Sequence, residues 1–211
     1  INGDVEKRTV WAKVLQSRGE MGYPYIFFTD NANNGAADVY KDKKLPIYAS
    51  NLCTEIMLPS DHNWSFVCVL SSINVLHYDK WKDTDAVETM IYFLDAVITE
   101  FLEKLEVYKN SDDLDDQQTF LFMERAYNFS KENRALGMGV LGWHSLLQSK
   151  MLPFDSQGAF DLNSEVFKNI KEHSNKASRD LAEKFGEPEL LKGYGRRNTT
   201  LNAVAPTTSS A

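Results

Sequence analysis

The segment from Asn51 to Ser60, NLCTEIMLPS, places an amide, a thiol and a carboxylate at alternate positions. Residues 47–49 before these three positions and residues 56–58 after them are mostly apolar, which predicts extended chain. Side chains of a strand alternate between its two faces. Asn51, Cys53 and Glu55 are therefore predicted to share one face of a strand.

Spacing alone leaves two interpretations of this triplet. Free cysteine is among the most buried residue types, so Cys53 could be a core residue whose polar neighbours are satisfied locally. Alternatively, the triplet belongs to a reactive site. A neighbouring carboxylate raises the pKa of a thiol, whereas a thiolate nucleophile needs positive surroundings. The triplet thus suits a cysteine that works as a neutral thiol or as a radical.

Outward from this segment, the pattern predicts strands at both ends of a long helical middle. Extended chain is predicted at 23–29, 47–58, 66–75 and 199–206, with a turn at 30–35. Helices are predicted at 5–18, 85–105, 117–130, 135–148 and 163–186. The helix at 85–105 is the clearest, because its apolar residues recur every three or four positions. The sequence therefore predicts a mixed α/β fold in one domain.

The composition argues against several classes of protein. The net charge is −7 and Lys and Arg do not cluster, so a nucleic-acid groove is not predicted. No run approaches the roughly 18 apolar residues that cross a bilayer. Two cysteines, Cys53 and Cys68, are too few for a disulfide scaffold or a cysteine zinc site. No metal site is predicted, and reduced thiols in the cytoplasm are expected.

Gly137, Gly139 and Gly142 match the G-x-G-x-x-G pattern of dinucleotide-binding sites. That fingerprint requires a hydrophobic strand immediately before it. Here the preceding residues, NFSKENRA, are polar and typical of a helix. We therefore predict that the glycines allow close packing of the helix at 135–148, and that they bind no nucleotide.

Two further segments could contribute to a site. Cys68 lies in the strand-like run FVCVLSSINV and would face the same space as Cys53 if their strands were neighbours; a core cysteine is the alternative. The chain ends in APTTSSA, where hydroxyls and backbone N–H groups follow a predicted strand. Loops of this kind bind phosphate, and a simple polar turn is the alternative.

Four motifs, taken together and in this order, resemble the large catalytic subunit of ribonucleoside-diphosphate reductase, in particular class I enzymes of bacteria and phages. The motifs are SNLCTEI, VCVLSSINV, RALGMGVLGWHSLL and RRNTTLNAVAPTTSSA. The resemblance extends from about Tyr23 to Ala211. It implies a ten-stranded α/β barrel, of which residues 1–211 would be a partial catalytic domain lacking its N-terminal and C-terminal parts.

The resemblance also implies roles for individual residues in reducing ribonucleoside diphosphates for DNA synthesis. Cys53 would become a thiyl radical that abstracts the 3′ hydrogen of the ribose, Glu55 would be the general base at the 3′ hydroxyl, and Asn51 would hold the substrate. Cys68 would supply reducing equivalents with a cysteine outside this chain. The implied substrate contacts are Asn51, Leu52, Cys53, Thr54, Glu55, Pro206, Thr207, Thr208, Ser209 and Ser210.

The implied partners lie outside the chain. A metal-containing small subunit would deliver the radical, thioredoxin or glutaredoxin would be the reductant, and nucleoside triphosphate effectors would bind elsewhere in the large subunit. No cofactor is expected on this chain, and the chain alone is expected to be inactive without the missing portions. Two alternatives stay open: a small cysteine hydrolase that pairs Cys53 with a histidine, and an inactive nucleotide-binding or scaffolding remnant.

Overall fold

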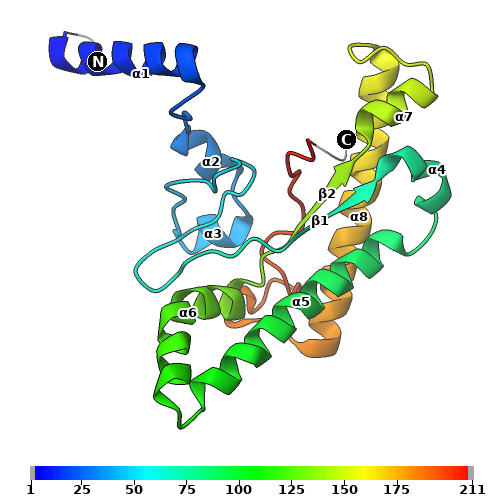
Figure 1. Ribbon diagram of the computed structural model, residues 1–211. Helices are drawn as coiled ribbons and strands as arrows, with labels where there is room; N and C mark the ends of the chain where they lie inside the picture. The colour runs from blue at the N-terminus through cyan, green and yellow to red at the C-terminus, as the bar shows by residue number, and fades with distance from the viewer. Residues whose placement is uncertain (1–2, 209–211) are drawn as a thin grey trace.

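Two parallel strands surrounded by helices form the centre of the structure, a computed structural model that describes residues 3–208 (Figure 1). The strands are β1 (Leu70–Asn74) and β2 (Gly137–Leu141). The helices are α1 (Val5–Met21), α2 (Thr29–Gly35), α3 (Asp38–Asp42), α4 (Tyr78–Trp81), α5 (Ala86–Lys109), α6 (Leu114–Asn133), α7 (Trp143–Ser149) and α8 (Gln157–Phe185). The short 3-10 helices are η1 (Val75–His77) and η2 (Glu189–Leu191).

The strands β1 and β2 pair in parallel register, with Leu70 opposite Gly137. A third extended segment lies along the other edge of β2. Its contacts centre on Met138, whose N–H donates to Leu201 O (2.8 Å) and whose carbonyl accepts from Ala203 N (3.1 Å). Only one residue pair there, Met138 with Asn202, forms a parallel bridge. The spatial order is therefore β1, β2, then residues 199–203.

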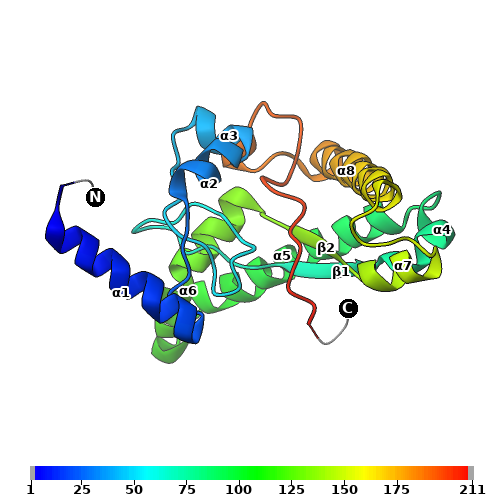
Figure 2. The same cartoon turned by 90° about the horizontal axis from the view of Figure 1, so that it is seen from above.

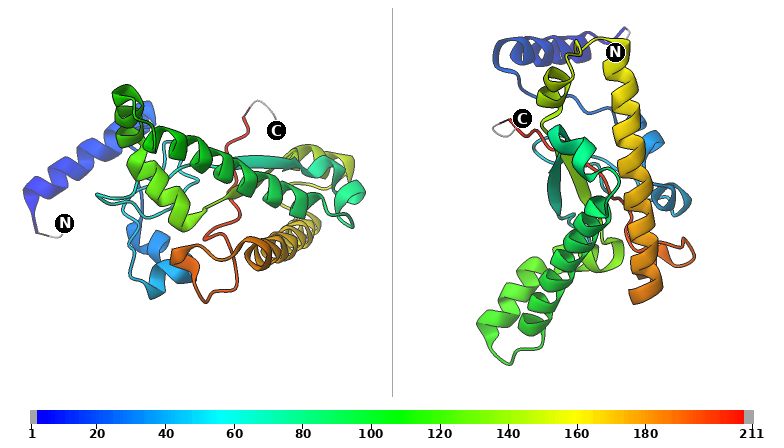
Figure 3. Two further views of the ribbon diagram at one scale, coloured as in Figure 1. Left: turned by 90° about the horizontal axis from the view of Figure 1, so that it is seen from below. Right: turned by 90° about the vertical axis from the view of Figure 1, so that its right-hand side faces the viewer.

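Helices α5 and α8 lie side by side on one side of these strands (Figure 3). The apolar stripe predicted for residues 85–105 is confirmed. Five of its six positions are buried, namely Val87, Ile91, Leu94, Ile98 and Leu105, and the sixth, Leu102, is half-buried. Burying each such side chain stabilises the fold by roughly 1.5–3 kcal/mol. The opposite side of the strands is left to the segments that form the candidate site.

Helix α1 extends away from the rest of the structure (Figures 1 and 2), and no residue of it is buried. The helix predicted at 5–18 is confirmed and continues to Met21. Local signals bound it: the Asp4 carboxylate accepts from Lys7 N (3.1 Å), and Gly22 adopts the left-handed φ of +77°. None of the described helices is both long enough and apolar enough to span a membrane.

Residues 135–148, predicted as one helix, form β2 and α7 instead. A Cβ atom on Gly139 would lie 3.2 Å from Val204 Cα and closer still to the carbonyl oxygen of Ala203. Only glycine lets the backbone of residues 203–204 come this near to β2. The glycines therefore permit close packing, as predicted, but they do so in a strand.

Two predictions near the N-terminus are also wrong. Residues 23–29 form no strand, because no neighbouring strand in the described part of the chain pairs with them. Residues 30–35, predicted as a turn, belong to helix α2. The side chain of Asn33 explains this, because it donates to Ile47 O (2.8 Å) and accepts from Ile47 N (2.9 Å). These tertiary hydrogen bonds stabilise a helix made of residues with weak helical propensity.

The remaining differences concern where elements begin. Helix α8 starts at Gln157, ahead of the predicted N-cap Asn163, because Ser156 Oγ accepts from Ala159 N (3.2 Å). Helix α6 starts at Leu114 and continues past the predicted end to Asn133. The predicted strand at 66–75 is limited to β1, and neither 47–58 nor 199–206 contains a strand beyond the one bridge.

Candidate active site

The segment from Asn51 to Ile56 is a closed turn, so the predicted strand and its alternation are wrong. Asn51 N donates to Ile56 O (3.3 Å), and Ile56 N donates to the side-chain oxygen of Asn51 (3.0 Å). Within the turn, Thr54 N donates to Asn51 O (3.1 Å) and Thr54 has a left-handed φ of +65°. An asparagine side chain that bonds to a nearby backbone N–H in this way replaces the hydrogen bond that a β-sheet would make. Cys53 is exposed at the tip, which also overturns its interpretation as a core residue.

Glu55 and Cys68 meet at one cavity of about 150 Å³. Its walls come from four stretches of chain, namely residues 55–58, 67–70, 135–137 and 200–203. The Oε2 atom of Glu55 is buried there and has no hydrogen-bond partner within residues 3–208. A buried carboxylate oxygen without a partner is costly, so this atom is suited to accept a hydrogen bond from a bound molecule.

The two thiols and the carboxylate share one electrostatic environment. Partial burial raises the pKa of the Cys68 thiol, and electrostatic interactions with Glu55 and then Cys53 raise it further. Cys68 is nonetheless exposed to solvent, so it is not a core cysteine. The structure therefore brings together Cys53, Glu55 and Cys68, whereas the chemical role of each stays a prediction.

Strand β2 and the segment after it shape the cavity from the other side. A Cβ atom on Gly137 would lie 3.0 Å from Ala203 Cβ and would overlap the side chain of Leu70. Gly137 therefore lets β1 and residues 199–203 approach β2 from both edges. This close approach places Thr200 and Asn202 on the cavity wall.

The terminal loop predicted to bind phosphate is described only in part. Pro206 and Thr208 are exposed, and Thr207 is half-buried with a left-handed φ of +48°. Ser209 and Ser210, predicted in the same role, lie outside the described residues. Phosphate binding by this loop stays a prediction.

Sequence reasoning missed a buried polar cluster that holds the segment leading to this loop. Arg134 donates to both carboxylate oxygens of Asp95 (2.8 Å each), and Arg197 and Asn198 donate to the same carboxylate (3.1 and 2.9 Å). One signal was available, because Asp95 interrupts an otherwise apolar stretch of the helix at 85–105. The partners of Asp95, by contrast, are distant in sequence and become evident only in the folded structure.

The described part of the chain contains no candidate metal site. Within residues 3–208, no three His, Cys, Asp or Glu side chains are grouped so that they could hold a metal ion. His173, one of the four histidines, contacts Glu88 Oε1 through Nδ1 (2.8 Å) on the α5–α8 side of the strands. That position is on the side of the strands away from the cavity.

Comparisons with known proteins agree with this geometry. Residues 2–190 match the family described as "Ribonucleotide reductase, barrel domain". A solved structure, the class Id ribonucleotide reductase alpha subunit of Actinobacillus ureae, is 55% identical with a TM-score of 0.87, and the match covers 98% of this chain and 38% of that one. The chain belongs to the barrel-domain family of the ribonucleotide reductase large subunit.

Viral proteins are among the relatives. A provisionally named ribonucleoside-diphosphate reductase large subunit of Frog virus 3 (isolate Goorha) is 40% identical over 207 residues, which are 98% of this chain and 35% of that protein. The ribonucleoside-diphosphate reductase large subunit of Invertebrate iridescent virus 3 is 33% identical over 98% of this chain and 31% of that protein. The chain thus spans about a third of the length of the curated relatives it matches. The predicted family and barrel fold are confirmed, and the hydrolase alternative is not favoured.

Proposed function

We propose that this chain carries the reaction centre of a ribonucleoside-diphosphate reductase, and that the complete large subunit converts ribonucleoside diphosphates to 2′-deoxyribonucleoside diphosphates. One observation carries the proposal. In a chain of the ribonucleotide reductase barrel family, an unpaired carboxylate oxygen of Glu55 and the thiol of Cys68 face one cavity beside the turn that bears Cys53.

In the proposed reaction, a thiyl radical on Cys53 takes the 3′ hydrogen atom of the ribose. Glu55 Oε2 accepts the proton of the 3′ hydroxyl, which promotes departure of the 2′ hydroxyl. That hydroxyl takes a proton from a thiol and leaves as water. Two electrons come from Cys68 and a cysteine outside this chain, which become a disulfide, and the second thiol hydrogen goes to C2′. Glu55 returns its proton to the 3′ oxygen. Finally, Cys53 returns the hydrogen atom to C3′, so that the radical is regenerated.

The environment of Cys68 supports this assignment. Because burial and the nearby charges raise its pKa, the thiol stays protonated at neutral pH and can give up a proton as well as an electron.

The substrate is proposed to lie between the turn and the terminal loop. The turn residues Asn51 to Glu55 would contact the ribose, and Pro206, Thr207 and Thr208, with Ser209 and Ser210 beyond the described residues, would bind the phosphates. Asn51 already uses its side-chain oxygen on Ile56 N, which leaves its NH₂ group to donate to the substrate.

The proposed partners complete the cycle. A metal-containing small subunit supplies the radical, and thioredoxin or glutaredoxin reduces the disulfide. Nucleoside triphosphate effectors bind to parts of the large subunit outside this chain. With Cys53 and Cys68 as its two cysteines, the chain lacks the second redox thiol and is proposed to be inactive alone. Reduced thiols fit a cytoplasmic location.

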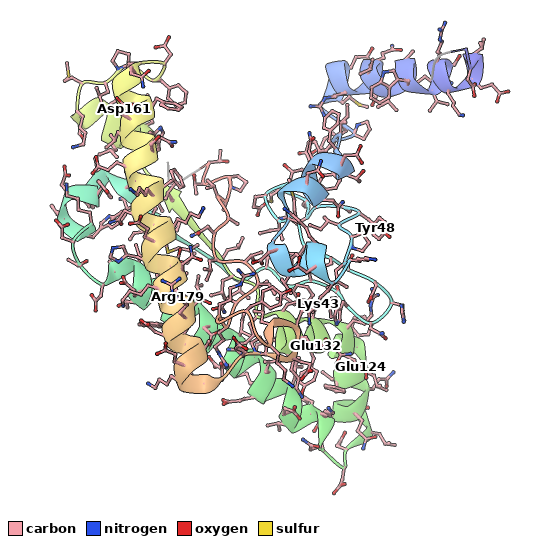
Figure 4. All side chains as sticks on the ribbon, turned by 180° about the vertical axis from the view of Figure 1, so that it is seen from behind. Lys43, Tyr48, Glu124, Glu132, Asp161 and Arg179 are labelled. Carbon is pink, nitrogen blue, oxygen red and sulfur yellow. The ribbon has the colours of Figure 1, made fainter. Side chains whose placement is uncertain are left out.

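The test uses the complete large subunit together with its small subunit, with formation of deoxyribonucleotide as the readout. Cys53→Ser should abolish the product, and Glu55→Gln should lower the rate by about 10²–10⁴-fold. Glu124→Gln is the matched control, because Glu124 is exposed on α6 (Figure 4) and should leave the rate unchanged. If Cys53→Ser kept its rate within tenfold of the wild type, the proposal would be wrong.

A further inference from the structure

The buried carboxylate of Asp95 joins three parts of the chain that are distant in sequence. Asp95 lies in the middle of α5 and is 3% exposed. Arg134, at the C-terminal end of α6, approaches it with a bidentate pair of hydrogen bonds and also donates to its backbone carbonyl (2.8 Å). Arg197 and Asn198 reach the same two carboxylate oxygens from the far end of the chain.

Each partner of Asp95 lies within three residues of a segment that lines the candidate cavity. Arg134 precedes residues 135–137, the first part of that wall. Arg197 and Asn198 precede residues 200–203, the second part. Asn198 also links the residues that precede these two wall segments directly, because its side chain donates to Arg134 O (2.9 Å). One carboxylate therefore sets where β2 and the terminal segment begin relative to each other.

The start of the terminal segment is also held by α8 and by the end of α6. Arg197 N donates to Ser178 O (3.1 Å) and Asn198 N donates to Ser178 Oγ (3.1 Å), while Thr199 N donates to Asn133 O (3.1 Å). The Arg197 guanidinium additionally caps α8 by donating to Phe185 O (3.1 Å) and Gly186 O (2.7 Å). Asp95 is the contact that joins Arg197 and Asn198 to α5 and to the Arg134 guanidinium, so a change at Asp95 would alter where the terminal segment begins.

Charge explains why a carboxylate is needed at this position. Burial opposes ionisation of Asp95, but the hydrogen bonds and charges of Arg134 and Arg197 outweigh it and hold its pKa below the usual range. The pKa of Arg197 is lowered by burial and by the positive charge of Arg134. Without the carboxylate, the two guanidinium groups would repel each other. Arg197 would be the one to move, because it lies on an irregular segment and is the more exposed side chain (14% against 5%).

We propose that Asp95 is a positioning residue of the substrate site, which sets the place of the terminal phosphate-binding loop by holding Arg197 and Asn198 against the start of β2. The proposal rests on the proposed function for its substrate. Asp95 itself touches no reacting atom. Its effect is on binding of the phosphate-bearing substrate, and it acts through residues 197–208.

The experiment measures two properties of Asp95→Asn in the complete large subunit. With the small subunit present, KM for the ribonucleoside diphosphate should rise at least tenfold while kcat changes less than threefold, because the chemical groups stay in place. Amide hydrogen exchange of the peptide 199–208 should become at least tenfold faster. This second measurement needs no activity, so it decides the positioning role even if the wild-type subunit fails to reduce ribonucleotides.

Glu88→Gln is the matched control. Glu88 is the other buried carboxylate of α5, and it contacts His173 and Lys176 of α8 without reaching the terminal segment. This control should leave KM and exchange of 199–208 within threefold of the wild type. If Asp95→Asn changed KM and exchange no more than Glu88→Gln does, or lowered kcat as much as it raised KM, the positioning role would be wrong.

A milder variant covers the case in which Asp95→Asn does not fold. Arg197→Lys keeps the positive charge but cannot reach Asp95, Phe185 O and Gly186 O together. It should raise KM at least fivefold and speed exchange of 199–208. Unchanged values for a folded Arg197→Lys would also overturn the proposal.

Discussion

Replacing Gly139 by alanine tests whether close packing of β2 controls the fold around the cavity. The new Cβ would point at the carbonyl oxygen of Ala203 and lie 3.2 Å from Val204 Cα. Both are backbone atoms and cannot rotate out of the way. The segment must therefore move away from β2 as a unit.

The cost of this movement can be estimated from the contacts it breaks. Overpacking of a tight site costs about 1–3 kcal/mol. The two hydrogen bonds of Met138 to Leu201 and Ala203 contribute about 0.5–1.5 kcal/mol each. Alanine recovers about 0.4–1 kcal/mol by restricting the unfolded chain. The free energy of unfolding should therefore fall by about 1–6 kcal/mol.

Urea denaturation followed by tryptophan fluorescence measures this difference. Gly19→Ala is the control, because a Cβ at Gly19 meets no atom within 4 Å and the residue lies inside helix α1. That control should be neutral or slightly stabilising. Surface substitutions usually change the free energy of unfolding by no more than about 0.5 kcal/mol. If the free energy of unfolding of Gly139→Ala lay that close to the wild-type value, the packing explanation would be refuted.

Three other changes probe the core and its polar contacts. Tyr40→Phe should cost about 1–3 kcal/mol in urea denaturation, because the hydroxyl contacts buried Asn133 Oδ1 (3.0 Å) and Thr199 Oγ1 (2.8 Å); no loss would contradict this. Ile91→Ala, at a fully buried position of α5, should cost about 2–5 kcal/mol, and a smaller loss would mean that the core collapses around the site. Burial, followed by the charge of Glu165, raises the pKa of Tyr78 from 10.0 to about 12. The contribution of this shift to the free energy of unfolding is therefore complete below pH 10 and is lost as the pH rises towards 12. In Tyr78→Phe, the free energy of unfolding should fall less between pH 10 and 12 than it does in the wild type.

The raised pKa of Cys68 and the unpaired oxygen of Glu55 have a common origin. Both groups are held at a cavity wall that has few polar neighbours to satisfy them. A protein that gained only stability from this region would be expected to pair a buried carboxylate oxygen. The unpaired oxygen of Glu55 therefore supports the proposed contact with a substrate.

The sequence by itself determined the long helices and the family. The apolar stripe of α5 and the cap residues of α1 are local signals, because a helix contacts its surroundings with a period set by its own backbone. The four motifs likewise indicated the ribonucleotide reductase barrel, because each of them is a short run of consecutive residues. They also singled out Cys53, Glu55 and Cys68, which the fold brings together.

Only the tertiary structure decided how the site is built. The tip that bears Cys53 is a turn because the Asn51 side chain bonds to Ile56 N, and a strand-like pattern cannot reveal that choice. Residues 137–141 are a strand because glycine lets residues 203–204 approach, so the cause lies more than 60 residues away. The partners of Asp95 lie 39 and 102 residues along the chain. Such contacts depend on which surfaces meet in space, whereas periodicity reports only on neighbours in sequence.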